Sequence, residues 1–324
     1  MSLERPRLRM QSVDFGGHAN HIPFPEHTAR LISSLWTFAL GGPLVMQRYL
    51  SLSRIFQHRK DSPARKRLGL KRPTRRLCHE HLEDRSLLAA LWVTTDADSG
   101  DGSLRWAISE ANNAGGPDTI EFASELADQT ITLTSGELHI TDDLTINGLG
   151  ADKLTISGNS SNRIFLVDDG NPNTTIMVSI SGLSLENGST SGQGGAILNK
   201  EDLTVEDSTL ADNSAYSGGG IFNWGRTLTV TNSTLADNSA TLGGGIYNNS
   251  STLTVTNSTL ADNSAYSGGG IFNNSSTLTV TNSTLADNSA TRNGGGIYNG
   301  YSSTLTVTNS TLANNSADDT GGGI

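Results

Sequence analysis

The most regular hydrophobic pattern in the chain is an alternation of apolar and polar residues over five positions. In Thr227-Leu-Thr-Val-Thr231, leucine and valine alternate with threonine. A period of two predicts a β-strand with one buried face, and β-branched residues favour that conformation. Asn232-Ser233 breaks the alternation and indicates a turn, after which Leu235 begins a second short strand. A turn at Asp237-Asn238 then leads to Gly243-Gly-Gly-Ile-Tyr-Asn248, which we expect to form a third strand.

This unit recurs along the C-terminal part of the chain. The motif Gly-Gly-Gly-Ile begins at Gly218, Gly243, Gly268, Gly294 and Gly321, in steps of 25, 25, 26 and 27 residues. A fixed period of this length is typical of a solenoid. Nothing recurs at the helical spacing of 3.6, and Gly, Asn, Ser and Thr are poor helix formers. The pattern therefore predicts an all-β fold, a single-stranded parallel β-helix with three short strands per coil and regular coils of about 25 residues from about residue 183.

Stacking of the coils turns matching positions into columns about 4.8 Å apart. Buried amides need hydrogen-bond partners, so one column predicts a structural ladder of side-chain amides: Asn213, Asn238, Asn263, Asn288 and Asn315. The residue before each forms an acidic column that we expect to be exposed, because like charges repel at this spacing: Asp212, Asp237, Asp262 and Asp287. Such carboxylates suit calcium, but the nonapeptide Gly-Gly-x-Gly-x-Asp is absent, and we predict no metal site and no cofactor.

A cap and irregular coils are expected before the regular repeats. Residues 91–130 are interpreted as the N-terminal cap and 131–324 as the β-helix. Ser103 is a plausible N-cap, and Leu104, Ala107, Ile108 and Ala111 fall on one face of a helix that follows it. Terminal coils of a solenoid expose their core, so a short capping helix is expected there.

Charge divides the chain into two parts. Residues 1–90 carry 16 Lys+Arg and 7 Asp+Glu, a net charge of +9, and the rest carries 6 and 25, a net charge of −19. A basic front before an acidic body indicates a leader, residues 1–90, which we predict to be largely disordered. The densely basic run from Arg48 to Arg76 has no aromatic residue after Phe56 and no partner fold, so we predict no nucleic-acid partner. Its first 45 residues are either part of the export signal or an over-extended reading frame with the true start at Met46.

Two short segments resemble known bacterial surface and secreted proteins. Leu82-Glu-Asp-Arg85 followed by Leu87-Leu-Ala89 resembles the leader of many secreted planctomycete proteins, which implies export. Ser103-Leu-Arg-Trp-Ala-Ile108 resembles the Ser-Leu-Arg-Glu-Ala-Ile signature that opens many bacterial β-helix surface proteins. Here Trp106 replaces the Glu, and Gly102 stands where that signature has a cysteine.

The repeat itself resembles that of the chlamydial polymorphic outer membrane protein family, whose motifs are Gly-Gly-Ala-Ile and Phe-x-x-Asn. Gly194-Gly-Ala-Ile197 matches the first motif, and Leu210-Ala-Asp-Asn213 is similar to the second. The resemblance covers about residues 183–324. It implies a right-handed, pectin-lyase-like β-helix at the cell surface, often used in adhesion.

Candidate catalytic groups are few. Pectin-lyase-like enzymes need paired carboxylates at a defined separation, or an acidic cluster beside a basic residue. The local acid pairs Asp142-Asp143 and Asp168-Asp169 both lie beside turn signals, and the repeats from Gly218 on hold only Arg226 and Arg292 as basic residues. We interpret both pairs as turn residues. Aromatic residues recurring near the glycine runs could form a sugar-stacking stripe, but packing between coils is the simpler interpretation.

The sequence thus favours an exported, non-enzymatic β-helix of the outer membrane, cell surface or extracellular space, acting in adhesion or structural display. Its expected partners are a surface glycan or a protein of a host or neighbouring cell. The motif stops at Gly321-Gly-Gly-Ile324, so an uncapped last coil is expected to allow self-association. Two alternatives stay open: a polysaccharide lyase or glycoside hydrolase, and a fragment of a larger surface protein.

Overall fold

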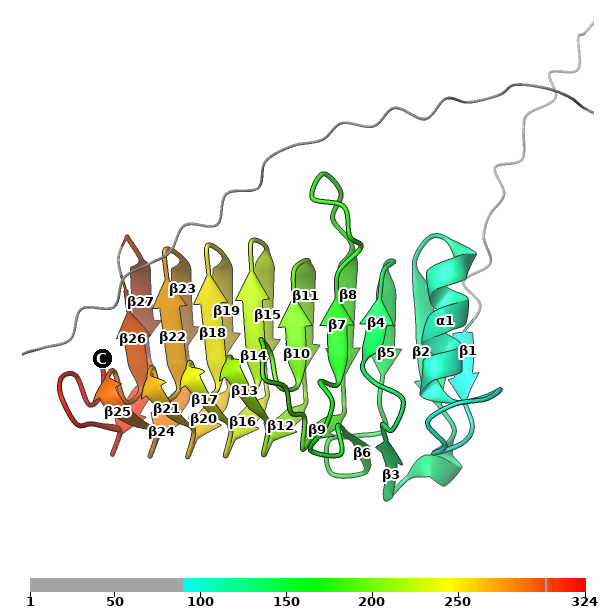
Figure 1. The fold of residues 1–324 in the computed structure, drawn as a ribbon, viewed down its shortest axis with the longest axis horizontal. Coiled ribbons are helices and arrows are strands. Elements are labelled where there is room, and N and C mark those ends of the chain that lie inside the picture. The colour runs from blue at the N-terminus through cyan, green and yellow to red at the C-terminus, as the bar shows by residue number, and fades with distance from the viewer. Residues whose placement is uncertain (1–89, 301) are drawn as a thin grey trace, which may run out of the picture. The chain divides into compact units, whose positions relative to one another are not determined.

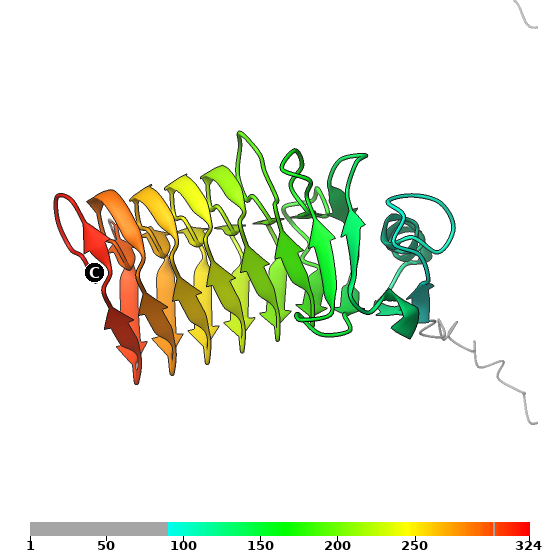
Figure 2. The same ribbon diagram turned by 90° about the horizontal axis from the view of Figure 1, so that it is seen from below.

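The computed structural model describes residues 90–300 and 302–324, which lie in one compact unit. The predicted leader, apart from Ala90, and with it Cys78, lies outside the described residues. The described chain winds into stacked coils, and the strands of successive coils pair in parallel to form four sheets, here named A to D (Figure 1). Figure 2 shows the coils following one another along a single axis.

Each sheet takes at most one strand from each coil. Sheet A contains β1 (Ala90–Val93), β2 (Asp118–Phe122), β5 (Leu144–Asn147), β8 (Met177–Ser181), β11 (Asp202–Glu206), β15 (Thr227–Thr231), β19 (Thr252–Thr256), β23 (Thr277–Thr281) and β27 (Thr304–Thr308). Sheet B contains β3 (Gln129–Thr132), β6 (Leu154–Ser157), β9 (Ser184–Glu186), β12 (Thr209–Ala211), β16 (Thr234–Ala236), β20 (Thr259–Ala261), β24 (Thr284–Ala286) and β28 (Thr311–Ala313). Sheet C contains β4 (Leu138–Ile140), β7 (Phe165–Val167), β10 (Ile197–Asn199), β14 (Ile221–Trp224), β18 (Ile246–Asn249), β22 (Ile271–Asn274) and β26 (Ile297–Asn299). Sheet D contains β13 (Ser214–Ser217), β17 (Ser239–Leu242), β21 (Ser264–Ser267), β25 (Ser289–Asn293) and β29 (Ser316–Ala317).

The all-β parallel β-helix predicted from the repeats is confirmed, but the prediction of three strands per coil is wrong. Sheet D supplies a fourth strand in the regular coils, between the asparagine turn and the glycine run. Its strand β17 has the sequence Ser-Ala-Thr-Leu, in which no residue is fully buried. It pairs in register with Ser264 and Ala265 of the next coil. Backbone pairing between coils therefore forms this strand without the apolar alternation that marks the others.

One apolar core runs through the coils and is built from the alternating residues. In one regular coil, Leu228 and Val230 of sheet A, Leu235 of sheet B and Ile246 of sheet C are completely buried. Each such side chain contributes about 1.5–3 kcal/mol relative to an exposed one. Because the register between coils is uninterrupted in sheets A to C, the same positions stack from coil to coil.

The N-terminal coil is covered by the helix α1 (Leu104–Ala114), as the sequence predicts (Figure 1). Its N-cap Ser103 accepts a hydrogen bond from the backbone N–H of Trp106. The four buried residues are those that the helical pattern selects, Leu104, Ala107, Ile108 and Ala111. A single 3-10 turn, η1 (Ser124–Leu126), follows β2. The helix shields the apolar interior of the first coil from water.

A partly buried ion pair fixes this helix to the loop before β4. Arg105 donates to the carboxylate of Asp98 at 2.7 Å and to the carbonyl oxygen of Gly136 at 2.7 Å. Asp98 also accepts from the backbone N–H groups of Thr134 and Ser135. Burial opposes the charge of Asp98, but the hydrogen bonds from Ser135, Arg105 and Thr134 outweigh it and lower its pKa to about 2. The carboxylate therefore stays ionised and holds the cap in place down to acidic pH.

Candidate functional site

The turn between sheets C and A differs strongly in chemistry from one described coil to the next. After β7 it is a long loop, residues 168–176, which rises beyond the turns of the other coils (Figure 1). In the next two coils the corresponding turns carry Lys200-Glu201 and Gly225-Arg226, and from then on they carry Ser250-Ser251 and Ser275-Ser276. Stacking brings the charged turns of three successive coils together.

Three carboxyl groups meet in these turns. One oxygen atom from each of Asp168, Asp169 and Glu201 lies within 4.8 Å of the other two. Glu201 is 3% exposed, and it accepts a hydrogen bond from the backbone N–H of Ile176 at 3.4 Å. The Lys200 ammonium lies 2.6 Å from a carboxylate oxygen of Asp168. The cluster therefore contains one buried acid, Glu201, and one carboxylate whose charge is neutralised by a lysine, Asp168.

The same carboxylates also hold the long loop in its conformation. Asp168 accepts from the backbone N–H of Gly170 at 2.9 Å, and Asp169 accepts from that of Asn171 at 2.7 Å. The hydroxyl of Thr174 donates to the second oxygen of Asp169. These are turn contacts of the kind that the sequence predicts for this pair.

The environment of the three acids raises the pKa of one of them and lowers the pKa of the other two. Burial, and then the negative charge of Asp169, raise the pKa of Glu201 above its usual value. Hydrogen bonds from Thr174 and from the backbone of Asn171 lower the pKa of Asp169. Burial opposes the charge of Asp168, but its contacts with Lys200 and Gly170 prevail and lower the pKa. Glu201 is thus the member of the cluster that retains a proton most readily.

A pocket of about 580 Å³ opens beside the cluster. Trp224, which is 48% exposed, forms part of its wall, and the Lys200 ammonium lies 5.8 Å from the centre of the indole ring. The Arg226 guanidinium donates to the carbonyl oxygens of Pro172 and Thr174, at 3.2 and 2.7 Å. An aromatic face, two cations and polar loop atoms are the groups that orient a sugar or another polar ligand.

The cluster offers oxygen ligands of the type that hard cations prefer. Three features oppose the binding of a cation by this cluster. Lys200 already neutralises Asp168, Glu201 must lose its proton against a raised pKa, and Asp169 is engaged by its own loop. The second predicted acid pair also serves turns, since Asp142 accepts from the backbone N–H of Gly116 and Asp143 from that of Met177.

The predicted asparagine column lies at the turn between sheets B and D. The amide nitrogen of Asn213 donates to the amide oxygen of Asn238 at 3.0 Å, and the contact repeats at 2.9 Å between each later pair down to Asn315. Asn213, Asn238, Asn263 and Asn288 are completely buried, whereas Asn315 is half-buried. The residues before them are all exposed and adopt a left-handed backbone with φ of 56°: Asp212, Asp237, Asp262 and Asp287.

A second amide ladder was not predicted. It lies in sheet C, and its side chains bond to one another at 2.8–2.9 Å: Asn199, Asn223, Asn248, Asn273 and Asn299. The signal in the sequence is the asparagine two residues after the isoleucine of each glycine motif. In the sequence this position falls at the end of a predicted strand, which by itself does not indicate burial.

The aromatic residues of sheet C pack on one another. Phe222, Tyr247, Phe272 and Tyr298 form a continuous stack with ring centroids 4.5–5.0 Å apart. Tyr216 and Tyr266 lie in sheet D, are about half exposed and do not belong to this stack. The expectation that aromatic side chains pack between coils holds for sheet C.

Comparison with known proteins places the fold in a family. The model of the family described as right handed beta helix region matches residues 144–323, which are 180 of the 324 residues. The chain therefore belongs to the right-handed β-helix family. No curated protein and no solved structure matches it. Within residues 90–300 and 302–324, no helix has the length and apolar character needed to span a membrane.

Proposed function

We propose that this β-helix is an exported, non-enzymatic repeat protein of the outer membrane, cell surface or extracellular space that serves in adhesion or structural display. The observation that carries the proposal is the nearly constant outer surface of the regular coils, which repeats the same polar side chains in register. Such a surface offers many equal contacts rather than one reactive centre. The resemblance of the repeat to the chlamydial surface family supports the same function.

The pocket beside Trp224 is proposed as the place where a surface glycan, or a polar group of a neighbouring cell's protein, is held. An indole ring that is half exposed beside Arg226 and Lys200 can contact the apolar face of a sugar while the cations and loop atoms bind its hydroxyls.

Fractionation of native cells tests the location. An antibody to the repeats should detect the protein at the cell surface, in the outer membrane or in the medium, and protease added to intact cells should remove the surface portion. A cytosolic enzyme serves as the control for lysis. Recovery of the protein with that enzyme, protected from protease, would defeat the proposal.

A second candidate function, a polysaccharide lyase or glycoside hydrolase, is favoured by one observation: a raised pKa at Glu201 beside a lowered pKa at Asp169. An acid and a base side by side can serve proton transfer. Their geometry argues against it, because two-carboxylate glycosidases hold these groups about 5–9.5 Å apart, whereas one oxygen atom of Glu201 lies within 4.8 Å of one oxygen atom of Asp169. Glu201 is also almost completely buried.

Assays of the full chain on uronic-acid polymers and neutral glycans separate the two candidates. We expect no bond cleavage, and we expect Glu201→Gln to keep the fold because the amide replaces an acid that readily stays protonated. Cleavage by the native chain that Glu201→Gln abolishes, and that the exposed Asp237→Asn leaves unchanged, would establish the enzyme instead.

A further inference from the structure

The outer face of sheet A carries a regular two-dimensional set of threonine side chains. Strands β15, β19, β23 and β27 share the sequence Thr-Leu-Thr-Val-Thr. The leucine and valine point into the core, so the three threonines of each strand face outwards. We name these residues the threonine array: Thr227, Thr229, Thr231, Thr252, Thr254, Thr256, Thr277, Thr279, Thr281, Thr304, Thr306 and Thr308.

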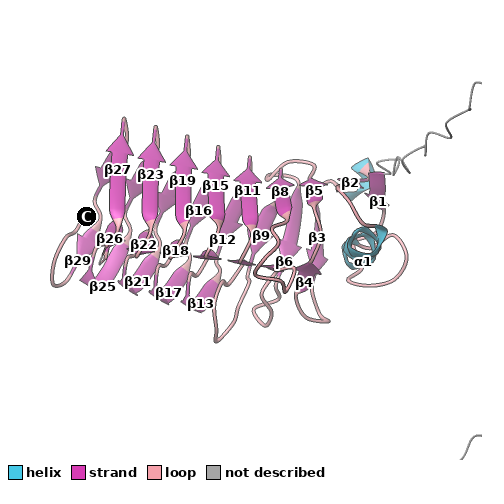
Figure 3. Cartoon of the chain, turned by 90° about the horizontal axis from the view of Figure 1, so that it is seen from above, coloured by secondary structure: helices cyan, strands magenta, loops and turns pink. Residues whose placement is uncertain are grey.

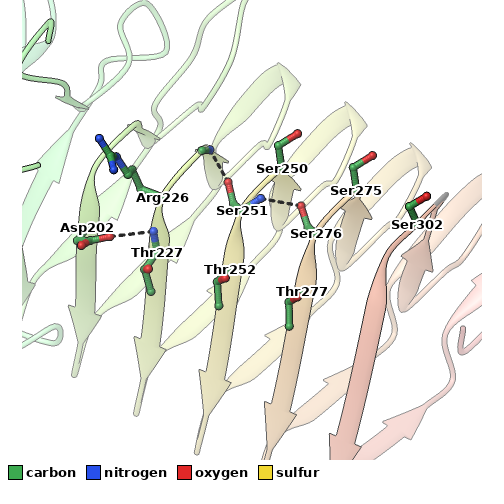
Figure 4. Close-up of a pocket in the computed structure, with 11 residues that line it drawn as sticks. Asp202, Arg226, Thr227, Ser250, Ser251, Thr252, Ser275, Ser276, Thr277 and Ser302 are labelled. Atoms are coloured by element: carbon green, nitrogen blue, oxygen red, sulfur yellow. Dashed lines mark hydrogen bonds between the residues drawn. The ribbon is translucent and has the colours of Figure 1, made fainter. Parts of the chain in front are cut away.

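The spacing within the array is fixed in both directions by the backbone. All four strands pair residue for residue, with no shift of register. Neighbouring coils are therefore about 4.8 Å apart, and alternate residues along a strand about 6.6 Å apart. Figure 3 shows the four strands side by side, and Figure 4 shows Thr227, Thr252 and Thr277 pointing the same way from successive strands.

The array combines free polar groups with small apolar ones. Within the described part of the chain, none of the twelve hydroxyls forms a hydrogen bond to another group, and all twelve residues are exposed or half-buried. The array contains no charged residue, and its N-terminal border is formed by Asp202 and Glu206 on the preceding strand. Branching at Cβ restricts the side-chain rotamers, so the hydroxyl and methyl groups need little ordering on binding.

A shallow polar groove extends this hydroxyl surface along one margin. It has a volume of about 480 Å³ and is lined by the first threonine of three strands and by serines of the turns before them (Figure 4). Ser250, Ser275 and Ser302 stand there in a row with the same period as the coils. The hydroxyl repeat thus continues past the strands, up to the charged turn at Arg226.

The periodicity restricts what can bind. A globular protein without internal repeats or a flexible polymer has no matching repeat in two directions, whereas a crystalline surface has one. Crystalline polysaccharides present flat apolar sugar faces for which aromatic platforms are suited, and the array contains no aromatic residue. Charged groups would impose their own hydration shells, and the array contains none. We propose that the threonine array binds the ordered water lattice of an ice surface, its hydroxyls holding water molecules at fixed spacing and its methyl groups ordering the water between them.

Partition of the purified full chain into slowly growing ice tests the proposal, with ice recrystallisation as a second readout. The native chain should enter ice in clear excess over a globular protein of similar mass and should slow recrystallisation. The double variant Thr254→Lys with Thr279→Lys, at the centre of the array, should lower that partition by about tenfold or more.

The matched control is Thr259→Lys with Thr284→Lys, which changes half-buried threonines of the same coils on sheet B. Circular dichroism and thermal melting verify that both variants fold. The control variant should partition as the native chain does. Exclusion of the native chain from ice, or equal loss in both variants, would overturn the proposal. Binding to crystalline cellulose or chitin, lost only in the Thr254/Thr279 variant and without ice partition, would overturn it in favour of a polysaccharide partner.

Discussion

Replacement of Gly269 with alanine is expected to lower the free energy of unfolding by about 3 kcal/mol or more. A Cβ at this position would lie 2.4 Å from the carbonyl oxygen of Gly295 and 2.4 Å from that of Ser289. Both atoms belong to the backbone of the next coil, so no side chain can move aside. The next coil must separate from Gly269, and the ladder hydrogen bonds around Gly269 and Gly270 are lost with that movement.

Urea unfolding followed by circular dichroism measures this effect. Because each coil contacts only its neighbours, the transition should also lose cooperativity, with the C-terminal coils unfolding first. Gly192→Ala is the matched control. Gly192 is exposed, its φ is not left-handed, and the nearest atom to an added Cβ is the Thr190 hydroxyl at 3.5 Å. Its stability should change by less than about 0.5 kcal/mol. An equal loss of unfolding free energy in the two variants would show that close contact between coils is not the reason for glycine in these runs.

The parts of the fold that depend on repetition could be predicted from the sequence. Alternation in Thr227–Thr231 gives one buried and one exposed face, and a constant repeat length places the same residue above itself in each coil. The confirmed capping helix follows from a local pattern, the N-cap Ser103 and an apolar face. Neither inference needs knowledge of distant contacts.

Features without local patterning could not be predicted in this way. Sheet D forms from segments such as Ser239–Leu242, whose polar and small residues carry no period, because the neighbouring coils already hold the backbone at pairing distance. The second amide ladder depends on Asn223 pointing inwards from a strand, where the sequence alone favours an exposed polar residue.

The acidic pocket is the clearest case of a site that the sequence does not reveal. Phe165 pairs with Ile197, a step of 32 residues, whereas the later coils repeat every 24 to 27. The long loop 168–176 produces this difference, and only the resulting register brings Asp168 and Asp169 to Glu201. The interpretation of the two aspartates as turn residues describes their backbone contacts but not their contact with the glutamate.

Removal of one amide from the predicted ladder should, like the alanine substitution at Gly269, strongly lower the free energy of unfolding. Asn263 is completely buried. Its amide nitrogen donates to the carbonyl oxygen of Leu235 and to the amide oxygen of Asn288, both at 2.9 Å. Its amide oxygen accepts from the backbone N–H of Asn238 at 3.1 Å and from the Asn238 amide at 2.9 Å. Asn263→Ala leaves these groups without partners in a dry interior, and we expect a loss of about 3 to 5 kcal/mol in the free energy of unfolding.

The comparison is with Asn274→Ala. Asn274 is half-buried, and its amide nitrogen donates a hydrogen bond to the amide oxygen of Asn249 at 2.9 Å. Water can replace that bond, so the cost should be about 1 kcal/mol or less. Hydrogen exchange should locate the difference, with protection lost at the Asn238 amide and in the coil that follows only in the Asn263 variant. If both substitutions cost the same, the ladder contributes no more than an exposed hydrogen bond. The apolar columns and the backbone pairing alone would then hold neighbouring coils together. The buried amide column would add no stability beyond theirs.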